Sequence, residues 1–243
     1  MKLLISRHGD CKKEINQKGF PQILGGSYEY NVGLTEKGFS QARRLSDIIS
    51  QENVSAAYSS SLTRAIQTAE TALKNKGISL SENELLNERH FGSLSGVFCD
   101  EAVLKYGVIH ELNKKILEKL LGLEYKHPTI SAYLKDVLYR KKPNINATTL
   151  ITINHDFPLE HVESIDTIKE RINEFEEMIR KYHGQKENVA IFTHGDVIRC
   201  WLEMIIDNPE KYSAETYQKT KEMPNKGRYR SVGNCEVFSF VLR

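Results

Sequence analysis

Two histidines near opposite ends of the chain are the residues best suited to chemistry, because each closes a short apolar run and precedes glycine. His8 ends the run LLISRHG, and His194 ends the run NVAIFTHG. Such runs are typical of buried strands, and parallel strands deliver their carboxyl ends to one edge of a sheet. In a sheet that pairs these two strands, we expect both imidazole rings to face one pocket.

Two arginines accompany these histidines. Arg7 directly precedes His8, and Arg64 lies in the segment SSSLTRAIQTAETAL. Apolar residues spaced by three and four, after serines that can cap, predict a helix with Arg64 in its first turn, where the helix dipole favours an anion. Guanidinium forks match phosphoryl oxygens in a bidentate way. The pattern therefore predicts an anion cradle.

Cleaving a phosphate monoester also needs a nucleophile and a proton for the departing alkoxide. His8 can be the nucleophile if its ring is neutral and a backbone carbonyl fixes the tautomer. Glu88, in the segment LNERHFGSLSG, is the candidate proton donor. The eight histidines and four cysteines form no HExxH motif and no cluster at ligand spacing, so we predict no metal site.

These residues need a framework of alternating strands and helices. Apolar runs predict strands at 2–6, 56–58, 188–193 and 236–242. Spacings of three and four predict helices after the N-cap Thr35, at 62–73, from 165 to near Gly184, and from 195 onward. This order indicates an α/β fold, in which helices cover both faces of a mostly parallel central sheet.

One domain spanning 1–243 is the simplest organisation, because no segment has the composition of a flexible linker. Residues 10–33 form a polar stretch without a period and are predicted to be a long surface loop. Residues at about 100–160 show a helical pattern broken by Gly107, Gly122 and Pro128. We predict that this stretch is a helical insertion that caps the sheet.

The charge balance excludes some classes of partner. The 34 basic and 32 acidic residues are well mixed and leave a net charge of +2, which predicts neither a nucleic-acid partner nor a membrane-surface partner.

The apolar run at 3–5 is too short for a signal peptide or a membrane span. The cysteines form no CxxC pair, so reduced thiols and a cytoplasmic location are expected.

Five motifs in a fixed order carry a resemblance to a known family. The chain resembles the histidine phosphatase superfamily, which includes the cofactor-dependent phosphoglycerate mutases. Each motif alone is weak evidence, whereas their ordered occurrence over most of the chain is specific. The motifs are RHG at 7–9, LTEKGFSQA at 34–42, SSLTRAIQTA at 60–69, LNERHFGSLSG at 86–96 and THGD at 193–196.

The resemblance implies a role for each matching residue. His8 would become phosphorylated, and Glu88 would protonate the leaving group and then, in hydrolysis, activate the attacking water. The transferring oxygens would be held by Arg7, Arg64 and His194, with further substrate contacts from Gly9, Arg89 and Gly195. The implied fold is the three-layer αβα arrangement of the phosphoglycerate mutases, and phosphatase members require no metal or organic cofactor.

The acceptor of the phosphoryl group separates the alternatives. KYG at 105–107 is shared with the glycolytic mutases, but no arginine pair follows it, and the segments THGDVIRCW and GNCEVFSF are more similar to phosphatase members. We expect a phosphatase that acts on small phosphate monoesters. The alternatives are a phosphoglycerate mutase and, from a different class, a catalytically silent phosphate-binding protein. The sequence is silent on the oligomeric state.

Overall fold

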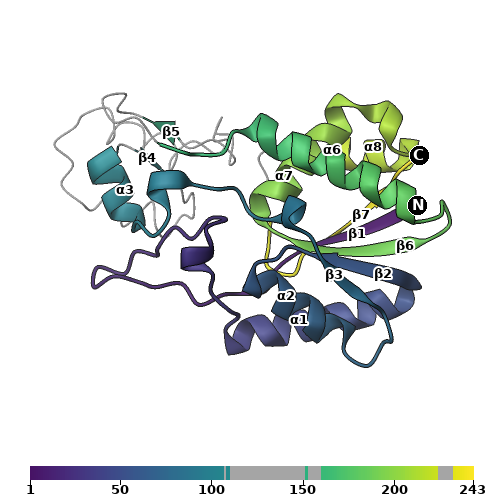
Figure 1. The fold of residues 1–243 in the computed structure, drawn as a ribbon, viewed down its shortest axis with the longest axis horizontal. Helices are drawn as coiled ribbons and strands as arrows, with labels where there is room; N and C mark the ends of the chain where they lie inside the picture. Colours follow the sequence, from purple (N-terminus) through teal and green to yellow (C-terminus); the bar gives the residue numbers. More distant parts are fainter. Residues whose placement is uncertain (107, 110–150, 153–159, 224–231) are drawn as a thin grey trace.

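A five-stranded sheet forms the centre of the protein, as a computed structural model shows (Figure 1). The structure describes residues 1–106, 108–109, 151–152, 160–223 and 232–243. The strand order is β3-β2-β6-β1-β7. The bounds of these strands are β1 Lys2–Arg7, β2 Val54–Ser59, β3 Leu80–Glu82, β6 Asn188–Thr193 and β7 Val237–Val241.

The pairing of β1 with β6 brings the two His-Gly segments together. These strands are parallel, with Lys2 opposite Asn188 and Arg7 opposite Thr193. The residues that follow, His8 and His194, therefore leave the sheet at the same edge. Strands β2 and β3 are also parallel to β6, and only β7 is antiparallel within this sheet. The prediction of a mostly parallel sheet is confirmed.

Helices cover both faces of the sheet and give three layers (Figure 1). One face carries α1 (Glu36–Gln51) and α2 (Thr63–Leu73), and the other carries α6 (Ile165–Tyr182) and α7 (Gly195–Asp207). Helix α8 (Ala214–Glu222) packs against α7. None of the helices in the described ranges is both long enough and apolar enough to cross a membrane.

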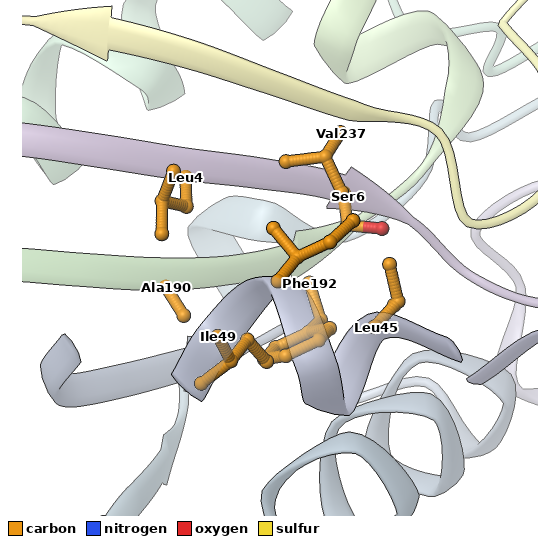
Figure 2. Close-up of a pocket in the computed structure, with 8 residues that line it drawn as sticks. Leu4, Ser6, Leu45, Ile49, Ala190, Phe192 and Val237 are labelled. Carbon is orange, nitrogen blue, oxygen red and sulfur yellow. The ribbon is translucent and has the colours of Figure 1, made fainter. Parts of the chain in front are cut away.

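Side-chain alternation along β1 supplies both cores. Leu3 and Ile5 point into the cluster formed with α6 and α7, whereas Leu4 points into the cluster formed with α1 and α2. Figure 2 shows part of the cluster formed with α1 and α2, where Leu45 and Ile49 of α1 face the sheet across a small apolar cavity. Burial on both faces explains why residues 3–5 of β1 and 189–192 of β6 are continuously apolar rather than alternating with polar residues.

The start of α2 differs from the prediction. Its N-cap is Leu62, and no serine side chain caps the helix. The Oδ1 atom of Asn31, from the loop before α1, accepts from the backbone N–H of Thr63 instead. Ser60 Oγ accepts from the N–H of Leu62, and its other hydrogen bonds are with His194 and Asn87. By contrast, Thr35 caps α1 as predicted, with its side chain accepting from Gly38 N.

Several smaller elements were not predicted from the pattern. They include β3, α8 and an antiparallel pair of two-residue strands, β4 (Val108–Ile109) and β5 (Ile151–Thr152). Helix α3 (Cys99–Tyr106) lies at the start of the predicted helical insertion at 100–160, whose remainder lies mostly outside the described residues, so the insertion stays a prediction. Short 3-10 turns occupy Tyr28–Tyr30, Glu84–Leu86, Gly92–Leu94 and Pro209–Lys211.

The packing of α1 against the sheet in Figure 2 gives a stability prediction. Leu45 is 2% exposed, so Leu45→Ala should lower the free energy of unfolding by about 2 to 5 kcal/mol through lost burial and an enlarged cavity. Ile48 lies on the same helix but is 38% exposed, so Ile48→Ala should cost about 1 kcal/mol. Denaturant unfolding of both variants measures the difference, and equal losses would contradict this packing.

Candidate active site

Two buried imidazole rings form the centre of the site. His8 follows β1, and His194 is the N-cap of α7 directly after β6. Their ring centroids are 5.1 Å apart with an interplanar angle of 57°, and neither side chain is exposed by more than 4%. The paired strands thus bring the two rings close together, as expected, and a ligand pocket in front of them stays a prediction.

Backbone geometry fixes the tautomer of His8. Its Nδ1 lies 2.7 Å from the carbonyl oxygen of Gly9, which can only accept a hydrogen bond. Nδ1 therefore carries the proton, and Nε2 keeps its lone pair. Burial, with Arg64 and Arg7 nearby, lowers the pKa of His8 well below its usual value, so the neutral ring is favoured.

His194 is oriented through Ser60. Its Nε2 lies 2.7 Å from Ser60 Oγ, and that hydroxyl donates to Asn87 Oδ1 at 2.8 Å. Because a serine hydroxyl has one hydrogen, Ser60 accepts from an Nε2–H of His194. Nδ1 of His194 is buried with no hydrogen-bond partner among the described residues. Burial and the charges of Arg64 and neighbouring groups lower the pKa of His194 well below its usual value.

Arg64 is held in the same buried region by one of its two terminal nitrogens. It is 2% exposed, and its Nη2 donates to the carbonyl oxygen of Gly25 at 2.8 Å. Its Nη1 is buried and has no hydrogen-bond partner in the described part of the chain. Burial lowers the pKa of this guanidinium. An unused, buried N–H group beside two neutral histidines is suited to an anion.

Arg7, which directly precedes His8, has a similar arrangement. Its Nη1 donates to the carbonyl oxygen of Val232 at 2.6 Å, while its buried Nε finds no partner within the described ranges. Both arginines are thus anchored through backbone carbonyls rather than through carboxylates. An arginine anchored by a neutral oxygen keeps its full positive charge for a ligand.

Two glycines bring the backbone close to the histidines. The N–H of Gly9 donates to Thr68 Oγ1 at 3.0 Å, and a Cβ atom at this position would lie 2.6 Å from the carbonyl oxygen of Gly38. Only glycine therefore fits between β1 and the start of α1. Gly195 is the first residue of α7, where backbone N–H groups and the helix dipole favour negative charge.

Glu88 reaches the N-terminus of α7. Its Oε1 accepts from the backbone N–H of Asp196 at 3.3 Å and from that of Arg89 at 3.0 Å. Its side chain also lines an open cleft of about 760 Å³. The structure therefore places the carboxylate at the helix end that follows His194. The described lining of the cleft comprises Gly26, Ser27, Tyr28, Glu29, Glu84, Leu85, Asn87, Glu88, His90, Glu163 and Arg171.

Arg89, a predicted substrate contact, occupies a different environment. Its side chain is buried, its Nε donates to the carbonyl oxygen of Glu163 at 2.8 Å, and its Cζ lies 5.7 Å from the centre of the Phe91 ring. It is not among the described residues that line the cleft. Contact between Arg89 and a substrate stays a prediction.

Sequence reasoning missed the residues that orient this group. Ser60 and Thr68 contact His194 and Gly9, and Asn87 accepts from Ser60, from the Ser61 N–H and from Ser61 Oγ. Ser60, Thr68 and Asn87 lie inside quoted motifs, but their types alone gave no signal for which partner they would contact. Among the described residues, no group of three His, Cys, Asp or Glu side chains could hold a metal ion.

The arrangement places two histidines and two arginines at the carboxyl edge of a mostly parallel sheet in an αβα fold. The profile of the histidine phosphatase superfamily (branch 1) matches residues 3–113 and 142–221. The chain therefore belongs to this superfamily, and it is an enzyme of the phosphatase or mutase kind.

Two curated relatives that are similar to the chain are named as mutases. A 2,3-bisphosphoglycerate-dependent phosphoglycerate mutase from Staphylococcus aureus (strain Newman) is 28% identical over 217 residues, which cover 85% of each chain. The mutase of the same description from Hamiltonella defensa is 25% identical over 213 residues, covering 84% of this chain and 77% of its own.

A solved structure resembles the fold over nearly the full length. The mycobacterial glucosyl-3-phosphoglycerate phosphatase superimposes with a TM-score of 0.62 and covers 98% of this chain and 88% of its own. The sequence identity is 15%, so the likeness concerns the fold alone.

The buried neutral histidines predict a pH-dependent stability. Below the ordinary histidine pKa of about 6.5, the unfolded chain binds protons that the folded chain does not bind, so the free energy of unfolding falls as the pH falls. Each histidine contributes up to about 1.4 kcal/mol per pH unit within this window. His194→Gln, which can still donate to Ser60, should therefore show a shallower decline.

Chemical denaturation between about pH 7 and pH 5 measures this slope. The buffer must contain no phosphate, because a bound anion favours protonated rings. Equal slopes for the wild-type protein and His194→Gln would contradict a neutral, buried His194.

Proposed function

We propose that the protein hydrolyses small phosphate monoesters through a phosphohistidine on His8. Nε2 of His8 attacks phosphorus, the bond to the ester oxygen breaks, and Glu88 gives that oxygen its proton. Water then attacks the phosphohistidine, Glu88 accepts the proton of this water, and the P–N bond breaks to release phosphate. Splitting one substitution into two is the general advantage of a covalent nucleophile.

The observation that carries this proposal is the contact between His8 Nδ1 and the carbonyl oxygen of Gly9. It leaves the lone pair on Nε2 of a ring whose pKa is held low by burial and by two arginines. The nucleophile is then ready without deprotonation near neutral pH. The same arginines, repelled by a protonated ring, are attracted to the phosphoryl oxygens that the ring attacks.

The other polar groups of the site fit the phosphoryl group. The buried N–H groups of Arg7 and Arg64 that lack partners among the described residues would donate to its oxygens. The backbone N–H of Gly195, at the start of α7, would add a further donor, whereas the N–H of Gly9 already donates to Thr68 Oγ1. Nδ1 of His194 can donate only after this ring gains a second proton, because Ser60 already uses Nε2. Phosphate binding therefore draws a proton onto His194.

The cleft beside Glu88 favours hydrolysis over mutase chemistry. Four of its described lining residues are carboxylates, Glu29, Glu84, Glu88 and Glu163. The one permanent cation among them, Arg171, is already paired with Glu163 at 2.7 Å. A second phosphate or a carboxylate of a bisphosphoglycerate would meet repulsion at these residues. Because the cleft is open, water can reach the Glu88 carboxylate that would activate it.

Phosphoglycerate mutase is the second candidate because relatives that match 84% and 85% of this chain carry that name. Members of the family act on small phosphorylated substrates such as phosphoglycerate derivatives. Both activities use the same phosphoenzyme and differ in the acceptor, which is water for a phosphatase and a substrate hydroxyl for a mutase.

A paired assay distinguishes the candidates. Wild-type protein and His8→Asn are incubated in chelator with p-nitrophenyl phosphate, and separately with 3-phosphoglycerate plus 2,3-bisphosphoglycerate. We expect phosphate release by the wild type and a loss of at least about 1,000-fold in His8→Asn, as removal of a covalent nucleophile predicts.

Isomerisation of phosphoglycerate without net phosphate release would favour the mutase instead. Absence of turnover in both assays, with no acid-labile phosphate on the protein, would favour a phosphate-binding protein without activity. Activity that appeared only on addition of a metal ion would contradict the histidine mechanism.

A further inference from the structure

The ion pair between Arg171 and Glu163 lines the cleft beside Glu88 but takes no part in the bond-forming and bond-breaking steps proposed above. Arg171 of α6 and Glu163, just before the N-cap of this helix, form a two-pronged contact. Nε of Arg171 donates to Glu163 Oε1 at 2.7 Å, and its Nη2 donates to Oε2 at 3.0 Å. Their side chains are 18% and 13% exposed, so solvent screens the pair only in part.

The same two side chains form hydrogen bonds with the backbone on both sides of Glu88. Before it, Nη1 of Arg171 donates to the carbonyl oxygens of Leu85, at 2.6 Å, and Asn87, at 3.1 Å. After it, Glu163 Oε2 accepts from the backbone N–H of His90 at 3.0 Å.

The backbone of Glu163 adds further hydrogen bonds. Its N–H donates to the carbonyl oxygen of His90 at 2.8 Å, and its carbonyl oxygen accepts from Arg89 Nε at 2.8 Å. The segment around Glu88 is thus tied to the start of α6 from both directions. This segment is a loop between the turns Glu84–Leu86 and Gly92–Leu94. It is also held from the side of α2, where Asn87 Oδ1 accepts from Ser60 and Ser61, and by the N–H of Gly26, which donates to the carbonyl oxygen of Arg89.

We propose that Arg171 and Glu163 are positioning residues that hold the Glu88 carboxylate at the leaving-group oxygen. This inference rests on the proposed function, in which Glu88 is the general acid. Proton transfer requires heavy atoms within hydrogen-bond distance, and a shift of about 1 Å can cost about 100-fold in rate. Neither residue contacts the phosphoryl group in this scheme, so phosphate binding does not depend on them.

The proposal depends on the shape of the guanidinium as well as on its charge. The planar fork of Arg171 meets a carboxylate with two nitrogens and directs its third toward two carbonyl oxygens. A lysine ammonium is a single compact donor centre and cannot keep this arrangement. Arg171→Lys should therefore resemble Arg171→Met more than the wild type.

The test uses leaving groups that differ in their need for a proton. For each variant, kcat/KM is measured with p-nitrophenyl phosphate, whose leaving group departs without protonation, and with an alkyl phosphate, whose alkoxide requires it. In this kinetic constant only the steps through phosphoenzyme formation count, so the later attack of water does not interfere.

We expect Arg171→Met to lower kcat/KM about 10- to 100-fold for the alkyl ester and less than about 3-fold for p-nitrophenyl phosphate, a partial version of losing the acid. Glu163→Gln removes the charge and replaces one acceptor oxygen by an NH2 group that must face a donor of Arg171 or His90, so it should give a loss in the same direction. Inhibition by inorganic phosphate should change little in either variant.

Arg180→Met is the matched control. Arg180 lies on the same helix and also donates to backbone carbonyls, those of Lys211 and Arg243, but at the other end of α6. It should lose stability without any selective loss for the alkyl ester. If Arg171→Met fails to fold, Arg171→Lys and Glu163→Gln make the same comparison.

Glu88→Gln separates the two claims. If Glu88→Gln shows the selective loss and the Arg171 and Glu163 variants slow both substrates equally, the positioning role is wrong and the proposed mechanism stands. If Glu88→Gln itself shows no selectivity, the acid role is wrong and the positioning role falls with it. Selective losses in all three variants support both.

Discussion

Two neutral imidazole rings and two guanidinium groups must stay together in a buried pocket, and this constraint shapes the rest of the structure. Each arginine lowers the pKa of both histidines. Protonation of the rings would add two positive charges beside the two guanidinium groups, so the neutral rings are favoured. Burial strengthens this preference. The resulting cluster has positive charge from arginine and a lone pair from His8, which is the combination that the proposed phosphoryl transfer to nitrogen requires.

The fold meets this constraint with backbone oxygens rather than with carboxylates. Carbonyl groups of Gly9, Gly25 and Val232 hold His8, Arg64 and Arg7, respectively. A carboxylate in these positions would raise the histidine pKa and compete with the substrate for the arginines. The parallel register of β1 and β6 then sets the two rings at the same edge, and the apolar layers on both faces of the sheet keep that register fixed.

The sequence predicted the parts that depend on local pattern. Apolar runs before His8 and His194 predicted the two strands, and Thr35 predicted the start of α1. Contacts between distant segments were not predictable in this way. Asn31 caps α2 across a loop, Ser60 orients His194 from the residue after β2, and Arg171 holds the Glu88 segment from α6. Each of these polar residues has many possible partners in a sequence, and only the packing of the layers selects one.

The central claim is that the tautomer of His8 directs the chemistry to one nitrogen. The most direct measurement is to trap the phosphoenzyme from an excess of substrate, denature it in alkali and assign the phosphorylated nitrogen by phosphorus–nitrogen coupling in NMR. The fixed Nδ1–H···O=C contact of Gly9 predicts phosphate on Nε2 of His8 alone. Phosphate on Nδ1, or on His194 or another residue, would contradict this account of the site.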